Sequence, residues 1–144
     1  MLIPTPYYAA FEFDLVARAG LKIQPVTTFE HSDAVIDEDS TIQVEAYYPN
    51  KQSLDAAYER SVKAGSHPRI LLLSSPNNPL GICYPAHVIQ ECMEWSEERS
   101  IHLVSDEIYA GSVYRKPLTD GNDITPWASV AEVAARSGRS LGPM

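Results

Sequence analysis

The chain has 144 residues, of which 44% are hydrophobic and 21% are charged, and this is enough to bury one sizeable core. Its formal net charge of -8 excludes a basic surface for nucleic acid or anionic membranes, and it favours a small-molecule partner. Two cysteines and the lack of a long apolar run predict a cytoplasmic protein with free thiols and no membrane partner.

The first expected elements are short. The apolar pair Leu2-Ile3 is followed by two prolines, which limits it to the end of a strand. Gly20 is expected to end a helix as a left-handed cap. In that helix Phe11, Leu15 and Ala19 recur at four-residue spacing, and Tyr8 joins the same apolar stripe. A second strand is expected over residues 22–26.

The sequence of the middle of the chain predicts one connecting segment, one helix and one buried strand. Residues 27–45 are polar and acidic without a sustained period, which favours a solvated connection. Ser53 is expected to cap a helix that Gly65 closes. Residues 69–74 form a continuous apolar run, which is typical of a strand buried on both faces of a parallel sheet.

A further helix and strand complete the predicted pattern. Pro85 is expected to open the helix, whose buried side consists of Val88, Ile89, Cys92, Met93 and Ser96. Residues 101–105 are expected to form a second buried strand. Strands that alternate with helices indicate βαβ units. The predicted fold is therefore α/β, a three-layer, mostly parallel sheet with helices on both faces.

Two polar segments follow the two apolar strands. The first is Pro76-Asn77-Asn78-Pro79-Leu80-Gly81, and the second is Ser105-Asp106-Glu107-Ile108-Tyr109. Ligands of open α/β sheets bind beyond the carboxyl ends of the strands, so these segments form the expected site. A carboxylate at the end of a buried strand, here Asp106, needs a cationic or hydrogen-bonding partner, such as a protonated ring nitrogen. Asn78 and Tyr109 are expected to reach the same ligand.

These segments resemble the large domain of fold type I pyridoxal phosphate enzymes, the class I and II aminotransferases. Within this family the chain is most similar to 1-aminocyclopropane-1-carboxylate synthase-like proteins. The resemblance covers about residues 2–133 and is carried by Pro4-Thr5-Pro6-Tyr7-Tyr8, Asn78-Pro79-Leu80-Gly81 and His102-Leu103-Val104-Ser105-Asp106-Glu107-Ile108-Tyr109. It implies pyridoxal 5'-phosphate as cofactor, an amino acid substrate, transamination or elimination chemistry, and a homodimer.

The resemblance also implies a role for each of four residues. Asp106 pairs with the pyridinium nitrogen and keeps it protonated, so that the ring accepts electrons from the substrate. Asn78 and Tyr109 donate hydrogen bonds to the phenolic oxygen of the ring. Tyr8 stacks on the ring, although Tyr7 beside it leaves the assignment open by one residue.

Two sequence features of the family have no counterpart in residues 1–144. None of the chain's lysines lies in the Ser-x-Ser-Lys context of the Schiff-base lysine, and no phosphate-binding turn precedes Leu2. Residues 1–144 are therefore expected to be a partial large domain without the N-terminal arm and the small domain. No catalytic residue is assigned, and two hypotheses stay open: part of an aminotransferase or synthase-like enzyme, or an inactive remnant that binds cofactor non-covalently or binds a partner chain.

Other polar residues have ordinary structural interpretations. Glu107 is expected to be a solvent-exposed or salt-bridge residue rather than a second catalytic carboxylate. No metal site is expected, because no paired ligand spacing occurs among the four histidines, His31, His67, His87 and His102.

Overall fold

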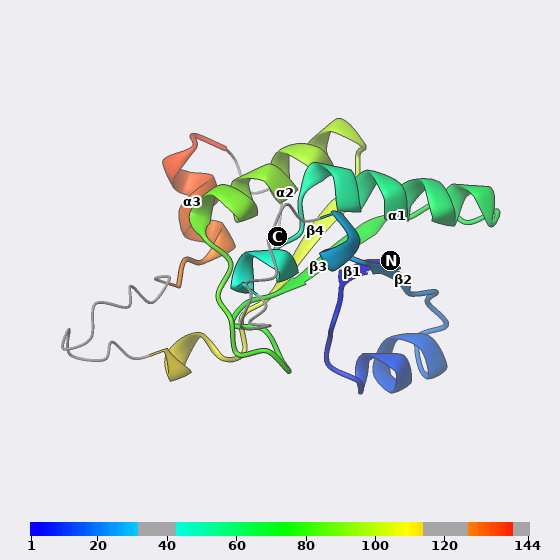
Figure 1. Cartoon of the computed structure of the whole chain (residues 1–144), viewed down its shortest axis with the longest axis horizontal. Helices are drawn as coiled ribbons and strands as arrows, with labels where there is room; N and C mark the ends of the chain where they lie inside the picture. The colour runs from blue at the N-terminus through cyan, green and yellow to red at the C-terminus, as the bar shows by residue number, and fades with distance from the viewer. Residues whose placement is uncertain (32–42, 114–126, 140–144) are drawn as a thin grey trace.

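The structure is a computed structural model that describes residues 1–31, 43–113 and 127–139. Within these residues four parallel strands form one sheet in the order β2-β1-β3-β4 (Figure 1). The strands are β1 Leu2–Pro4, β2 Gln24–Val26, β3 Ile70–Ser74 and β4 His102–Asp106. All three pairings are parallel, which confirms the predicted sheet.

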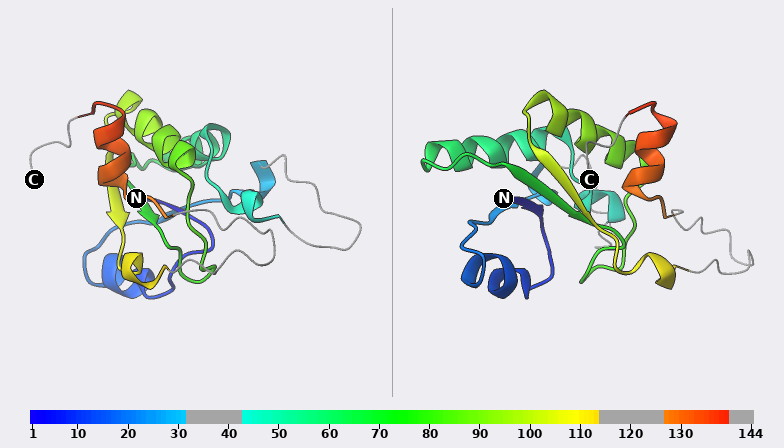
Figure 2. Two further views of the ribbon diagram at one scale, coloured as in Figure 1. Left: turned by 90° about the vertical axis from the view of Figure 1, so that its left-hand side faces the viewer. Right: turned by 180° about the vertical axis from the view of Figure 1, so that it is seen from behind.

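Helices lie on both sides of this sheet. The helices α1 (Lys51–Lys63) and α2 (Ala86–Glu98) cover one face, whereas the π-helix η1 (Glu12–Ala17) lies on the opposite side (Figures 1 and 2). Right-handed crossovers explain why the helices lie on both faces. The chain moves toward one edge of the sheet from β1 to β2, and it moves toward the opposite edge from β2 to β3 and β4. The three-layer α/β prediction is confirmed.

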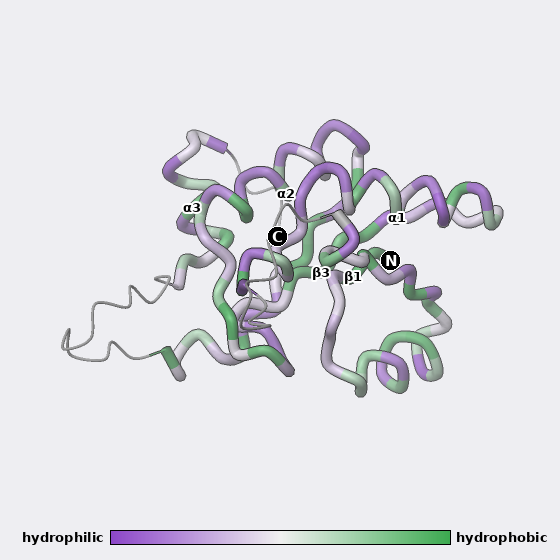
Figure 3. The backbone as a smooth tube through the Cα atoms, viewed as in Figure 1, coloured by the Kyte–Doolittle hydropathy of each residue, from purple (hydrophilic) through white to green (hydrophobic). Residues whose placement is uncertain are grey.

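The main core lies between the sheet and the helices α1 and α2. The strand β3 supplies Leu71 and Leu73, which are both fully buried, and Figure 3 shows the strongly hydrophobic path of this strand. From the helices come Leu54, Ala57, Val88, Ile89, Cys92, Met93 and Trp95. The side of α2 that was predicted to be buried therefore faces the core.

The helix α1 begins with a capping box that involves Asn50 and Ser53. The Ser53 backbone N–H donates to Asn50 Oδ1 at 2.9 Å, and the Asn50 N–H donates to Ser53 Oγ at 3.0 Å. The prediction that Ser53 is the N-cap is therefore wrong, because Asn50 holds that position and Ser53 is the third helical residue. Gly65 follows the helix with φ of 74°, as predicted.

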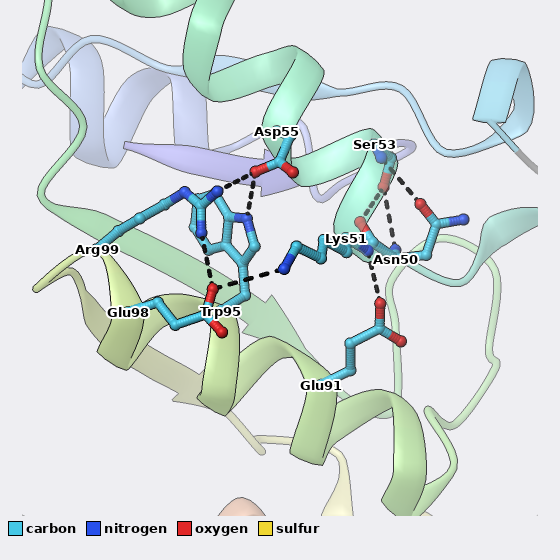
Figure 4. A network of polar contacts seen from close by, with 8 residues as sticks. All are labelled: Asn50, Lys51, Ser53, Asp55, Glu91, Trp95, Glu98 and Arg99. Atoms are coloured by element: carbon cyan, nitrogen blue, oxygen red, sulfur yellow. Dashed lines mark hydrogen bonds and ion pairs between the residues drawn. The ribbon is translucent and has the colours of Figure 1, made fainter.

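A polar network joins α1 to α2 (Figure 4). The Trp95 Nε1–H donates to Asp55 Oδ1 at 2.9 Å, and Arg99 forms an ion pair with the same carboxylate. The Arg99 guanidinium also lies 4.5 Å from the centre of the Trp95 ring. Lys51 of α1 and Glu98 of α2 form a further ion pair at 3.7 Å. The two helices are thus joined by charge as well as by apolar packing.

Some predicted elements differ from the structure. Strand β4 was expected to be buried, but it is an edge strand, and 41% of Val104 is exposed. The first helix has π geometry and no buried residue. The helix α3 (Val130–Arg136) was not predicted, and three short 3₁₀ helices are also present, Phe29–His31, Val44–Tyr47 and Ala110–Ser112. Most of the expected solvated connection lies outside the described residues.

No helix among the described residues is both long and apolar enough to cross a membrane.

Candidate functional site

The sheet has a topological switch point between β1 and β3. The chain leaves β1 toward β2 on one side, and it leaves β3 toward β4 on the other side. The segments that follow these neighbouring strands therefore diverge and leave a crevice at their carboxyl ends. One hydrogen bond spans the crevice, from Asn77 Nδ2 to the carbonyl oxygen of Pro6 at 3.4 Å.

The loop after β3 is held by Asn77, a residue that is 5% exposed. Its Oδ1 accepts from the Leu80 N–H at 3.0 Å, and its carbonyl oxygen accepts from the Gly81 N–H at 2.7 Å. Gly81 has φ of 68°, a conformation that glycine adopts without strain. Asn77 is thus used within the loop. The neighbouring Asn78 is half-buried, and its side chain makes no hydrogen bond to any described residue, so it is available to a ligand.

Asp106 ends β4 beside the end of β3. Its Oδ2 accepts from Ser74 Oγ at 3.2 Å, and its Oδ1 accepts from the Ile108 N–H at 3.3 Å. The Ser75 N–H donates to the Asp106 carbonyl at 3.0 Å, which extends the β3–β4 ladder to the first residue of the loop. Within the described part of the chain no cationic side chain pairs with this carboxylate. The carboxylate is half-buried, and each of its two oxygens accepts a hydrogen bond.

A cavity of about 440 Å³ lies beyond the carboxyl ends of β3 and β4. Asn78 and Tyr109 both line it, together with Pro76, Asn77, Pro79, Gly81, Cys83, Ser112 and Val113. The structure thus brings together two of the four predicted site residues. Asp106 lies at the adjacent strand end but is not among the lining residues.

Tyr8, the fourth predicted site residue, is not among the residues that line this cavity. It is 45% exposed, and its ring packs edge-on against Phe11 with centroids 5.6 Å apart. The neighbouring Tyr7 donates from its hydroxyl to Glu12 Oε1 at 2.5 Å. Burial, with support from Glu12, raises the pKa of Tyr7 to about 12. The Tyr7 hydroxyl is therefore a neutral group that donates its hydrogen bond to Glu12.

A second, larger cavity of about 540 Å³ lies at the amino ends of the strands, where Lys22, Gln24, His67 and Arg69 line it. Ligands of open α/β sheets bind at the carboxyl ends, so size alone does not make this cavity the site. The smaller cavity carries the predicted motif residues, and it is the candidate site.

Glu107 has a structural role that the sequence did not indicate. Its Oε1 accepts from the Val130 N–H at 2.9 Å, from Ser129 Oγ at 3.2 Å and from Ser105 Oγ at 2.8 Å. The Trp127 Nε1–H donates to the carbonyl of Ser75 at 2.9 Å. Residues 127–139, the α3 segment, thus contact both site loops. The available sequence signal was Ser129, a good N-cap before an apolar run.

The lysines that the structure describes lie away from the candidate site. Lys51 pairs with Glu98 between α1 and α2, Lys63 pairs with Glu59 on α1, and Lys22 lines the cavity at the opposite end of the sheet. Lys116 lies outside the described residues. No group of three or more potential metal ligands occurs among the described residues.

The two cysteines are protonated thiols. Cys83 lines the site cavity and is half-buried, whereas Cys92 is fully buried in the core. Burial raises the pKa of both thiols.

The residues present fit a flat pyridine ring. Asn78 and Tyr109 offer a neutral amide and a phenol at one concave surface, and Asp106 offers an unpaired anion at the neighbouring strand end. A carboxylate nearby would favour the protonated form of a ring nitrogen.

Comparison with known proteins covers nearly the whole sequence. The profile of the family described as aminotransferase class I and II matches residues 1–137. The chain is 36% identical over 142 residues to 1-aminocyclopropane-1-carboxylate synthase 3 of Oryza sativa subsp. japonica, covering 99% of this chain and 27% of that protein. It is 34% identical over 133 residues to 1-aminocyclopropane-1-carboxylate synthase 7 of Arabidopsis thaliana, covering 92% and 25%. The chain spans about a quarter of the length of these relatives.

Solved structures agree. A mutant aspartate aminotransferase of Thermus thermophilus matches with a TM-score of 0.54 and 25% identity, covering 74% of this chain and 23% of that one. An aminotransferase from Mycobacterium tuberculosis, at 21% identity and a TM-score of 0.54, shows the shared fold and covers 83% of this chain and 27% of that one. The chain belongs to the class I and II aminotransferase family.

Proposed function

We propose that this chain forms the cofactor floor of a pyridoxal 5'-phosphate enzyme that acts on amino acids. The proposal is carried by one observation: Asn78 and Tyr109 converge on a single cavity at the carboxyl edge of the sheet, beside the unpaired carboxylate of Asp106. Similarity to synthases and aminotransferases supports either elimination or transamination as the reaction.

Each proposed residue has a defined task. When bound, the cofactor supplies an electron sink for a carbanion at the substrate amino acid. Asp106 holds the proton on the ring nitrogen, since a negative carboxylate favours the charged form of that nitrogen. Asn78 and Tyr109 orient the ring through hydrogen bonds to its phenolic oxygen. Tyr8 is proposed to stack on the ring on the basis of the family resemblance alone.

The test is a titration of the 144-residue chain with pyridoxal 5'-phosphate, followed by absorbance. Asp106→Asn keeps the shape of the side chain but removes its charge, and we expect a dissociation constant about tenfold or more higher. Asp14→Asn is the matched control, because Asp14 is an exposed acid on η1 whose side chain is 51% accessible. Equal affinities for the unmodified chain and Asp106→Asn would refute the assignment of Asp106.

A second candidate function is non-covalent cofactor binding without turnover. It is favoured by the positions of Lys22, Lys51 and Lys63, none of which lines the site cavity. Borohydride reduction in the presence of pyridoxal 5'-phosphate, followed by peptide mapping, separates the two candidates. A pyridoxyl adduct on one specific lysine supports the enzyme, whereas binding without an adduct supports the non-covalent function.

The remaining assignments belong to the same proposal. An amino acid is the proposed substrate, a second copy of the chain is the proposed partner, and the cytoplasm is the proposed location. All three are supported by membership of the family.

A further inference from the structure

The α3 segment, residues 127–139, contacts both loops of the proposed site. At the loop after β3, Trp127 Nε1 donates to the carbonyl of Ser75 at 2.9 Å. At the loop after β4, the Val130 N–H and Ser129 Oγ donate to Glu107 Oε1 at 2.9 and 3.2 Å. Ser75 and Glu107 are sequence neighbours of Pro76, which lines the cavity, and of Asp106.

These contacts close a ring. The Ser75 N–H donates to the Asp106 carbonyl at 3.0 Å, and Asp106 is covalently followed by Glu107. Glu107 accepts from Val130, the chain leads back three residues to Trp127, and Trp127 donates to Ser75. A closed ring of this kind limits the relative motion of the two loops more than any single contact does, because one loop cannot move without breaking several bonds.

We propose that Glu107 is a positioning residue, which acts through the α3 segment to hold the Asn78 loop and the Asp106–Tyr109 loop at a fixed separation. This inference rests on the proposed function, because the role of Glu107 is to keep Asn78, Asp106 and Tyr109 arranged around the pyridine ring of a bound cofactor. Supporting residues that lock the geometry of a site raise ligand affinity without contacting the ligand.

The position of Glu107 distinguishes this role from general stabilisation. One carboxylate oxygen accepts from three donors, and these come from β4 and from the start of the α3 segment. The other end of the α3 segment is held separately, since Arg139 pairs with Glu94 at 3.2 Å and with Glu97 at 3.3 Å on α2. Arg139→Gln therefore weakens the docking of the same segment without touching either site loop, which makes it a matched control.

The first experiment uses the chain without ligand and measures amide hydrogen exchange. The Ser75 amide reports directly on the bond between the two loops. We expect Glu107→Ala, and separately Trp127→Phe, to speed its exchange about tenfold, since each removes a link of the ring. Glu107→Gln keeps an acceptor oxygen and should restore slow exchange, and Arg139→Gln should change it by no more than about twofold. Unchanged Ser75 exchange in Glu107→Ala overturns the proposal.

The second experiment measures the affinity of the same variants for pyridoxal 5'-phosphate. Glu107→Ala is expected to bind about tenfold more weakly than Arg139→Gln at a temperature where both variants are folded. Equal losses of affinity that follow equal losses of Tm would show a merely structural role and would overturn the proposal. If the unmodified chain does not bind the cofactor, the proposed function fails, while the hydrogen exchange result still decides whether Glu107 holds the two loops together.

Discussion

At the scale of single residues, Tyr7 gives the chain a pH dependence in the alkaline range. Its hydroxyl donates to Glu12, and its pKa is raised to about 12 from an ordinary value near 10. Between these two values the folded chain keeps a proton that the unfolded chain loses, so the free energy of unfolding falls as pH rises. This contribution is complete below about pH 10 and is lost through about pH 12. Denaturant unfolding of the unmodified chain and of Tyr7→Phe over this range should show a steeper fall for the unmodified chain. Parallel curves would exclude the effect.

At the scale of elements, the start of α1 is the best defined helix terminus. The Asn50 and Ser53 side chains satisfy each other's backbone N–H groups. Asn50→Ala should lower the free energy of unfolding by about 1 kcal/mol, whereas Asn50→Asp should leave it nearly unchanged because aspartate also accepts from the third helical N–H. Urea unfolding monitored by circular dichroism measures both variants. An alanine variant as stable as the unmodified chain would show that the capping box contributes little.

The elements also show where sequence reasoning ends. Strand β3 was predicted correctly because a continuous apolar run is a local property of a buried strand. The neighbouring β4 has a similar run, and its exposed Val104 depends on which strands stand beside it, which no local pattern records. Helix α3 has only 7 residues, too few for a clear periodic signal. The roles of Glu107 and Trp127 come from partners far apart in the sequence, 23 and 52 residues away.

At the scale of the whole molecule, both outer strands of the described sheet, β2 and β4, have a neighbour on one side only. Near β4, 41% of Val104 and 77% of Ile108 are exposed. An open edge with apolar side chains favours strand addition from another copy. Light scattering of the chain should therefore show a mass that rises with concentration, and Val104→Lys should reduce the rise. Phe13→Lys, which removes a 62% exposed ring from η1, serves as the control and should leave association unchanged. A sharp monomer at every concentration would contradict this expectation.

The divergence of the chain at β1 and β3 has an evolutionary consequence. The crevice there exists because of the order of the strands, and no particular side chain creates it. Substitutions in the segments that follow β1 and β3 can therefore alter what is bound while the sheet keeps folding in the same way. One ancestral scaffold can in this manner give rise to descendants with different chemistries, and sequence divergence in such a lineage should concentrate in the loops while the strands stay apolar.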